Sequence, residues 1–228
     1  MSQIQVDIKR TSSPKTGKLF QPSEAESLVN ILKALAFVFP QIGYCQGMNY
    51  VAAALYSYFS TQDEGSSDLN AEDNTFLLFV SLMVHKRLKP LFTSQVPDYH
   101  LRNYILKELL NQFLPQLMSH FKKLNLNLEM LTGNWLMTLF TGYLPYDLLM
   151  PILDNFFLEG WSAIYRVSIA LLELLAPKFL EHNDMGMIAQ TINNLRQENF
   201  AGVSVNKLLV RAYKIDFSTK ELPEDDRL

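Results

Sequence analysis

Hydrophobic residues recur every three or four positions along most of the chain, which is the spacing of an α-helix. In residues 23–39 this spacing predicts a helix that Ser23 caps, with Glu26 completing a capping box, and that Pro40 ends. The same spacing predicts further helices over these approximate ranges: 48–59, 76–87, 99–120, 135–140, 145–160, 161–175, 185–196 and 204–213. No alternation typical of a β-strand is sustained. The pattern therefore predicts an all-α fold.

One proline suggests where the chain divides. Pro115 interrupts the helical stretch 99–120, and we place a boundary there between two helical subdomains, 1–115 and 116–215. The last residues, 216–228, predict a frayed acidic tail.

Other breaks lie within or between the predicted helices. Pro151 is predicted to kink its helix or end it early, and Pro177 to end the helix that follows. Gly160 is predicted to cap the C-terminal end of the first of these helices. Residues 60–70 predict a surface loop.

Composition limits the class of protein. Apolar residues make up 48% of the 228 residues and charged residues 19%, proportions typical of a globular protein. The net charge of −3 argues against nucleic acid as a main partner, because phosphate binding requires a concentrated basic face. Lys9, Arg10, Lys15 and Lys18 are a local exception. They form either a solvated basic stretch or a patch for an acidic or phosphate-bearing partner.

The single cysteine, Cys45, excludes an intramolecular disulfide framework and fits a reducing compartment. No apolar run approaches the roughly 18 residues that a membrane-spanning helix needs. We therefore expect a cytoplasmic protein without a transmembrane segment, which reaches endomembranes only through its partners.

Residue patterns for several kinds of catalysis are missing. The four histidines, His85, His100, His120 and His182, are scattered without metal-ligand spacing. The chain has neither a glycine-rich phosphate loop nor a Gly-x-Ser-x-Gly elbow. We expect no cofactor and no metal ion bound by the chain itself.

Two short motifs carry the candidate chemistry: Ile4-x-x-Asp7-x-x-Arg10-Thr11 and Tyr44-Cys45-Gln46-Gly47-Met48-Asn49. An arginine and a glutamine suit the stabilisation of a phosphoryl-transfer transition state that another protein carries, because that chemistry depends on positioning and electrostatics. Asp7 lies three residues before Arg10. It either holds the guanidinium in a charge-assisted pair or is a helix charge without a catalytic part.

Together the motifs resemble two signature motifs of the TBC domain, the catalytic domain of Rab GTPase-activating proteins. The resemblance covers about residues 4–200 and includes these later segments: 135–140, 144–154, 157–160 and the apolar helix after Trp161. The family's third motif commonly contains Arg-Ile-Trp-Asp, whereas this chain has Pro151-Ile152-Leu153-Asp154. We expect this difference to alter packing or the choice of partner.

The resemblance implies a two-subdomain helical fold that activates GTP hydrolysis by a Rab-type small GTPase and so regulates vesicle trafficking. It implies that Arg10 is an arginine finger and that Gln46 is a glutamine finger, which replaces the switch glutamine of the GTPase. The partner would bind GTP and Mg²⁺. The chain would complete that partner's active site rather than turn over a substrate of its own.

Asp7, Thr11, Tyr44, Gly47 and Asn49 are predicted to support the two fingers. Gly47 would let the backbone approach the nucleotide closely. Asn49 would support Gln46 or touch the partner. A purely structural role in packing or in the turn remains the alternative for Tyr44 and Asn49.

Two other functions are compatible with the same sequence. The first is a helical adaptor that binds a Rab-type GTPase without accelerating hydrolysis, and the second is a helical scaffold without a GTPase partner. Family domains usually have several helices ahead of the first motif, whereas this chain begins almost at it. If the N-terminal subdomain is truncated, we expect Ile4, Val6 and Ile8 to be exposed and Arg10 to be poorly held.

Overall fold

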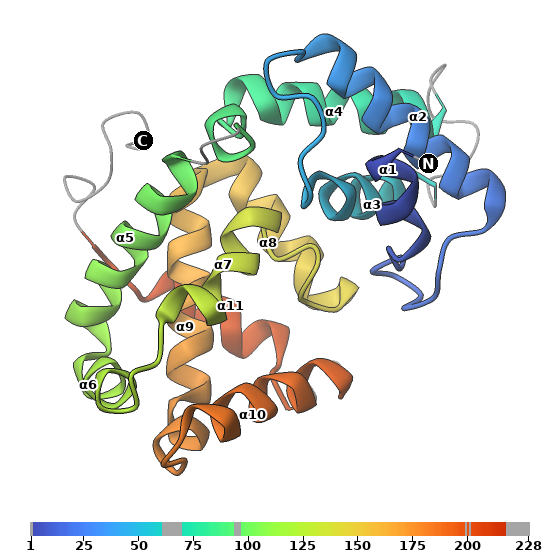
Figure 1. The fold of residues 1–228 in the computed structure, drawn as a ribbon. Coiled ribbons are helices and arrows are strands. Elements are labelled where there is room, and N and C mark those ends of the chain that lie inside the picture. Colours follow the sequence, from blue (N-terminus) through green and yellow to red (C-terminus); the bar gives the residue numbers. More distant parts are fainter. Residues whose placement is uncertain (1, 61–69, 94–96, 199, 201, 218–228) are drawn as a thin grey trace. The chain divides into compact units, whose positions relative to one another are not determined.

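The structure is a computed structural model that describes residues 2–60, 70–93, 97–198, 200 and 202–217. Within these residues the chain forms α-helices and no β-strand, apart from an isolated bridge between Ser12 and Leu19, so the all-α prediction is confirmed (Figure 1). The helices are α1 (Gln3–Lys9), α2 (Pro22–Val38), α3 (Met48–Phe59), α4 (Ala71–His85), α5 (Pro97–Phe113), α6 (Pro115–Lys123), α7 (Leu128–Thr138), α8 (Tyr146–Glu159), α9 (Trp161–Leu180), α10 (Met185–Gln197) and α11 (Val205–Tyr213), with a 3₁₀ turn at Lys89–Leu91.

The chain divides into two compact units. The first consists of Met1–Asp98 and Met137–Gly142, and the second of Tyr99–Leu136 and Tyr143–Leu228. The boundary that the sequence suggested, at Pro115, lies inside the second unit, between α5 and α6. Pro115 occupies the first position of α6, where its missing N–H leaves no helical bond unmade. It therefore separates two helices without separating two units.

Two predicted segments lie largely outside the described residues. These are most of the surface loop, at 61–69, and most of the acidic tail, at 218–228.

In the first unit α2 packs against α1, α3 and α4, and α3 packs against α4. Each of the three longer helices contributes an apolar stripe to the core, and the stripes are Leu28, Ile31, Leu32 and Leu35 of α2, Val51, Ala52 and Leu55 of α3, and Phe79, Leu82 and Met83 of α4.

The start of α2 differs from the prediction: Gln21, not Ser23, is the N-cap, and Glu24 completes the capping box. Pro22 explains the shift, because its fixed φ suits the first helical position.

Helix α1 is short and well held. Ser2 caps it, and Gln5 completes the capping box. Ile4 and Ile8 are buried, whereas Val6 is 42% exposed. Ile4 and Ile8 are thus not exposed as a truncated subdomain would leave them, because α1 packs against α2 and α3.

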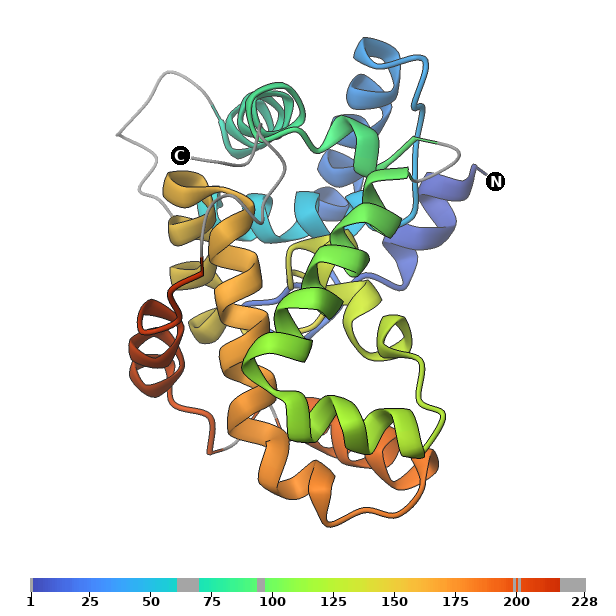
Figure 2. The same cartoon turned by 90° about the vertical axis from the view of Figure 1, so that its left-hand side faces the viewer.

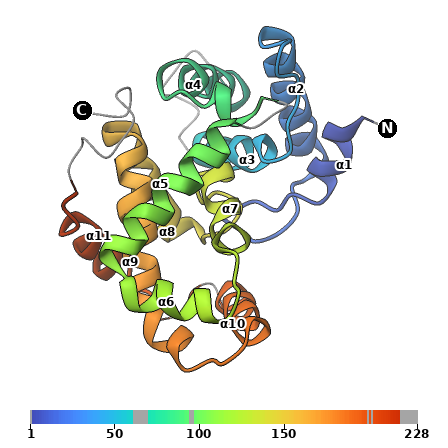
Figure 3. The ribbon, with the colours of Figure 1, turned by 60° about the vertical axis from the view of Figure 1, so that its left-hand side comes forward.

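The second unit is built around α9. Helices α6, α8, α10 and α11 contact it, and α11 also contacts α8 (Figure 2) (Figure 3). Pro151 and Pro177 both lie inside helices, so the predicted early ends of α8 and α9 are wrong. A proline removes one helical hydrogen bond. Burial of neighbouring side chains such as Ile152 and Phe179 outweighs that loss.

Candidate functional site

The first motif begins on α1 and ends just past it, with Arg10 as the C-cap of the helix. The spacing of three residues, about one helical turn, brings the side chains of Asp7 and Arg10 together. Arg10 Nη2 donates a hydrogen bond to Asp7 Oδ1 at 2.6 Å. The Asp7 side chain is fully buried, whereas that of Arg10 is 55% exposed. One edge of the guanidinium is thus anchored on a buried carboxylate, and the rest of it faces solvent.

The second motif follows a tight turn after α2. Gly43 has a φ of +64° and Gly47 a φ of +113°, values that residues with a Cβ rarely adopt. The conformation and not the available space favours glycine at position 47, since a Cβ there would make an ordinary van der Waals contact, 3.4 Å from Met137 Cγ. These two glycines allow the chain to reverse and start α3 at Met48.

Tyr44 connects this turn to α1. Its hydroxyl donates to Asp7 Oδ2 at 2.6 Å and lies 3.2 Å from Asn49 Oδ1. Burial, together with the hydrogen bond to the Asp7 carboxylate, raises the pKa of Tyr44 far above its ordinary value. The tyrosine therefore stays protonated and remains a donor.

Asn49 makes a second connection between the motifs. Its Oδ1 accepts from Gly47 N at 3.0 Å, and its Nδ2 donates to Thr11 Oγ1 at 2.8 Å. The Thr11 hydroxyl in turn donates to the backbone oxygen of Asp7 at 2.7 Å. Asn49 and Thr11 are both buried, so these bonds are shielded from water.

Gln46 lies between these fixed points. Its side chain is exposed, whereas Cys45 before it is half-buried and Gly47 after it is buried. Met48 N donates to Cys45 O at 3.2 Å, and Cys45 N donates to Met48 Sδ at 3.3 Å. Gln46 therefore projects an exposed amide from a turn whose backbone is held on both sides. Burial also raises the pKa of the Cys45 thiol.

The structure thus brings Asp7, Arg10, Thr11, Tyr44, Gly47 and Asn49 into one hydrogen-bonded group, called here the Asp7 network. Sequence reasoning missed one member, Gln3, whose Nε2 donates to Asp7 Oδ1 at 3.0 Å. The sequence feature that could have identified Gln3 is its position four residues, about one helical turn, before Asp7. The network holds the exposed Arg10 cation and the turn that carries the exposed Gln46 amide, two groups that can act on the phosphate oxygens of another molecule.

The part of the chain that the structure describes contains no group of three or more His, Cys, Asp or Glu residues that could hold a metal ion. None of the described helices is both long enough and apolar enough to cross a membrane.

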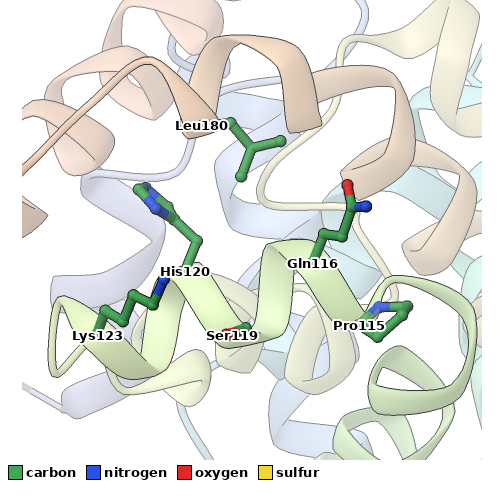
Figure 4. A pocket seen from close by; sticks show the side chains of 6 residues that line it. All are labelled: Pro115, Gln116, Ser119, His120, Lys123 and Leu180. Carbon is green, nitrogen blue, oxygen red and sulfur yellow. The ribbon is translucent and has the colours of Figure 1, made fainter.

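A pocket of about 420 Å³ lies in the second unit, beside α6 and the end of α9 (Figure 4). Its lining residues are Pro115, Gln116, Ser119, His120, Lys123 and Leu180. Lys123 belongs to the last turn of α6, where a cation stabilises the negative end of a helix, and this role accounts for Lys123 without a ligand.

The family model of the Rab-GTPase-TBC domain matches residues 1–180 of this chain. The chain belongs to this family. This TBC chain is 28% identical over 197 residues to the human ecotropic viral integration site 5 protein homolog, an alignment of 86% of the chain and 23% of that protein. It is 29% identical over 195 residues to the Rab GTPase-activating protein eat-17 of Caenorhabditis elegans, covering 85% of the chain and 21% of that protein.

The fold of the TBC chain also matches a solved member of the family. The crystal structure of the Chlamydomonas flagellar RabGAP TBC domain superposes with a TM-score of 0.74 at 23% identity, covering 93% of this chain and 68% of that one. The TBC chain thus spans only about a quarter of the length of the curated relatives it matches.

Proposed function

We propose that this TBC chain accelerates GTP hydrolysis by a Rab-type small GTPase, with Arg10 and Gln46 entering the partner's GTP site as two fingers. The observation that carries the proposal is the Asp7 network, which joins the exposed Arg10 to the turn that presents Gln46. The names of relatives such as the Rab GTPase-activating protein eat-17 support the class of partner. The partner binds GTP and Mg²⁺, and the TBC chain completes its active site.

Arg10 suits the charge that develops during phosphoryl transfer. A guanidinium is always protonated and offers several N–H donors in one plane. One donor is engaged by Asp7, which leaves the exposed remainder for the transferring phosphoryl group. Because the Asp7 carboxylate is buried and fixed by Tyr44, the guanidinium is oriented before the partner arrives. Such a finger accelerates hydrolysis by about a thousandfold or more.

Gln46 suits the attacking water. A neutral amide can accept a hydrogen bond from the water and donate one to the γ-phosphate without changing its protonation state. The held backbone at Cys45, Gly47 and Met48 limits the positions that this amide can take. Gln46 thereby replaces the switch glutamine of the GTPase.

In the cell, this activity would end the GTP-bound state of a Rab-type GTPase and so regulate vesicle trafficking. The chain would act from the cytoplasm and reach endomembranes through its partner.

Phosphate release from a panel of GTP-loaded Rab-type GTPases tests the proposal. We expect acceleration by the wild type and a loss of about a hundredfold or more in both Arg10→Ala and Gln46→Ala, because each variant removes a transition-state contact. The matched controls are Lys33→Ala, an exposed cation on α2, and Gln41→Ala, an exposed glutamine before the turn. Both controls should retain wild-type rates.

A binding measurement on the same panel of GTPases separates the alternatives. Binding to a GTPase without acceleration would support the adaptor function, and absence of binding throughout the panel would support the scaffold function. Either result would contradict the proposal.

A further inference from the structure

Asp7 receives three hydrogen bonds from side chains in three different places. Oδ1 accepts from Arg10 Nη2 at 2.6 Å and from Gln3 Nε2 at 3.0 Å, and Oδ2 accepts from Tyr44 at 2.6 Å. A carboxylate with donors on both oxygens cannot rotate about its last bond without breaking one of them. The orientation of the Asp7 carboxylate is therefore fixed from both sides.

Gln3 has a distinct part in this arrangement. It lies in the first turn of α1 and its side chain is exposed, so it adds little to the apolar core. Only its amide nitrogen can donate, and the carboxylate can only accept, so the direction of the bond is unambiguous. Gln3 and Arg10 share the same oxygen from opposite ends of the helix.

We infer that Gln3 is a positioning residue for the arginine finger, acting on Arg10 through the Asp7 carboxylate. This inference rests on the proposed function. Without Gln3, the remaining donor on Oδ1 is the exposed Arg10 side chain, which can move together with the carboxylate, so the bond from Tyr44 to Oδ2 is left to hold the carboxylate in place. A mobile Arg10 guanidinium adopts the geometry that the phosphoryl group requires less often. This slows the chemical step without weakening the binding of the partner.

The test compares Gln3→Met with Gln5→Met in single-turnover GTP hydrolysis, using the most responsive GTPase of the panel. Methionine has a similar length and no donor, and both changes are on α1. Gln5→Met is a matched control because it weakens the capping box of α1 without touching Asp7. For Gln3→Met we expect the rate at saturating TBC chain to fall about tenfold, with the half-saturating concentration within about twofold of wild type. Gln5→Met should keep the wild-type rate.

A second measurement separates positioning from a general structural effect. It is the affinity for the GTPase loaded with GDP and aluminium fluoride, which mimics the transferring phosphoryl group. Gln3→Met should weaken this affinity about tenfold in the wild-type background and have no effect in the Arg10→Ala background, because the two residues act as one unit.

Three results would overturn the inference. They are a saturated rate for Gln3→Met equal to wild type, an equal loss for Gln5→Met, or an undiminished effect in the Arg10→Ala background. Each of these leaves the proposed function standing as long as the wild type accelerates hydrolysis. A wild type that accelerates hydrolysis of no GTPase in the panel would overturn both.

Discussion

The hydroxyl of Tyr44 donates a hydrogen bond of 2.6 Å to Asp7 Oδ2, although 37 positions separate the two residues in the sequence. This bond joins the motif that carries Arg10 to the motif that carries Gln46. Arg10 and the turn that carries Gln46 are thus joined by one set of hydrogen bonds. A substitution in either motif should therefore alter the position of the other motif.

Removal of this bond should affect both stability and activity. In Tyr44→Phe the buried Asp7 carboxylate loses one donor, which should cost about 2 kcal/mol of unfolding free energy. Stimulated GTP hydrolysis should fall about tenfold as Arg10 loses its fixed anchor. Urea unfolding and phosphate release measure the two effects. Tyr104→Phe, at a residue that is 62% exposed, is the control and should match wild type in both.

The same tyrosine predicts a dependence on alkaline pH. Its pKa is raised above the ordinary value of 10.0, mainly by burial and further by Asp7, so the folded protein retains a proton that the unfolded chain releases. The resulting stabilisation is fully present below about pH 10 and declines as the pH rises toward the raised pKa. The difference in unfolding free energy between wild type and Tyr44→Phe should therefore shrink between pH 8 and pH 11. A constant difference would contradict the assignment.

Much of the fold could be predicted because helices leave a local signal. The 3.6-residue spacing located α2, α3, α8, α10 and α11 to within a few residues and the start of α9, and the glycine at 160 marked the boundary between α8 and α9. Prolines were the less reliable signal. Pro22 moved the start of α2, and Pro151 and Pro177 did not end their helices, because tertiary burial outweighs one lost hydrogen bond.

The candidate site was predictable as a set of residues but not as a network. Asp7 and Arg10 could be paired from their spacing on a helix. The bonds from Tyr44 to Asp7 and from Asn49 to Thr11 connect residues 37 and 38 positions apart, and nothing local in the sequence encodes them. The division into two units likewise depends on the packing of segments that are distant in the sequence, so it could not be located from the proline at position 115.

Replacement of Gly47 should strain the backbone. An alanine is strained at a φ of +113°, although its Cβ would make an ordinary contact of 3.4 Å with Met137, so Gly47→Ala should cost about 1–3 kcal/mol of unfolding free energy. Because Gln46 is the preceding residue, stimulated hydrolysis should fall at least tenfold. Gly17→Ala is the control: Gly17 has a φ of +67° and open space around it. That variant should lose stability and keep its activity, as measured by thermal unfolding and phosphate release.

Asn49 should not be replaceable by aspartate. Asn49→Asp removes the donor to Thr11 and buries a second negative charge close to Asp7. We expect a loss of about 3 kcal/mol or more in unfolding free energy at neutral pH, with partial recovery at low pH as the new carboxyl is protonated. Asn30→Asp, at an exposed position of α2, should change stability by less than about 0.5 kcal/mol. Equal losses in the two variants would contradict the role given to Asn49.

The central claim is that Gln46 supplies the glutamine that orients the attacking water. Its most direct test is single-turnover hydrolysis by a responsive Rab-type GTPase whose own switch glutamine has been changed to alanine. The account predicts that the wild-type TBC chain still accelerates hydrolysis by this GTPase, and that Gln46→Ala does not. Loss of acceleration by the wild-type chain would show that the partner's glutamine performs the chemistry and would contradict the account.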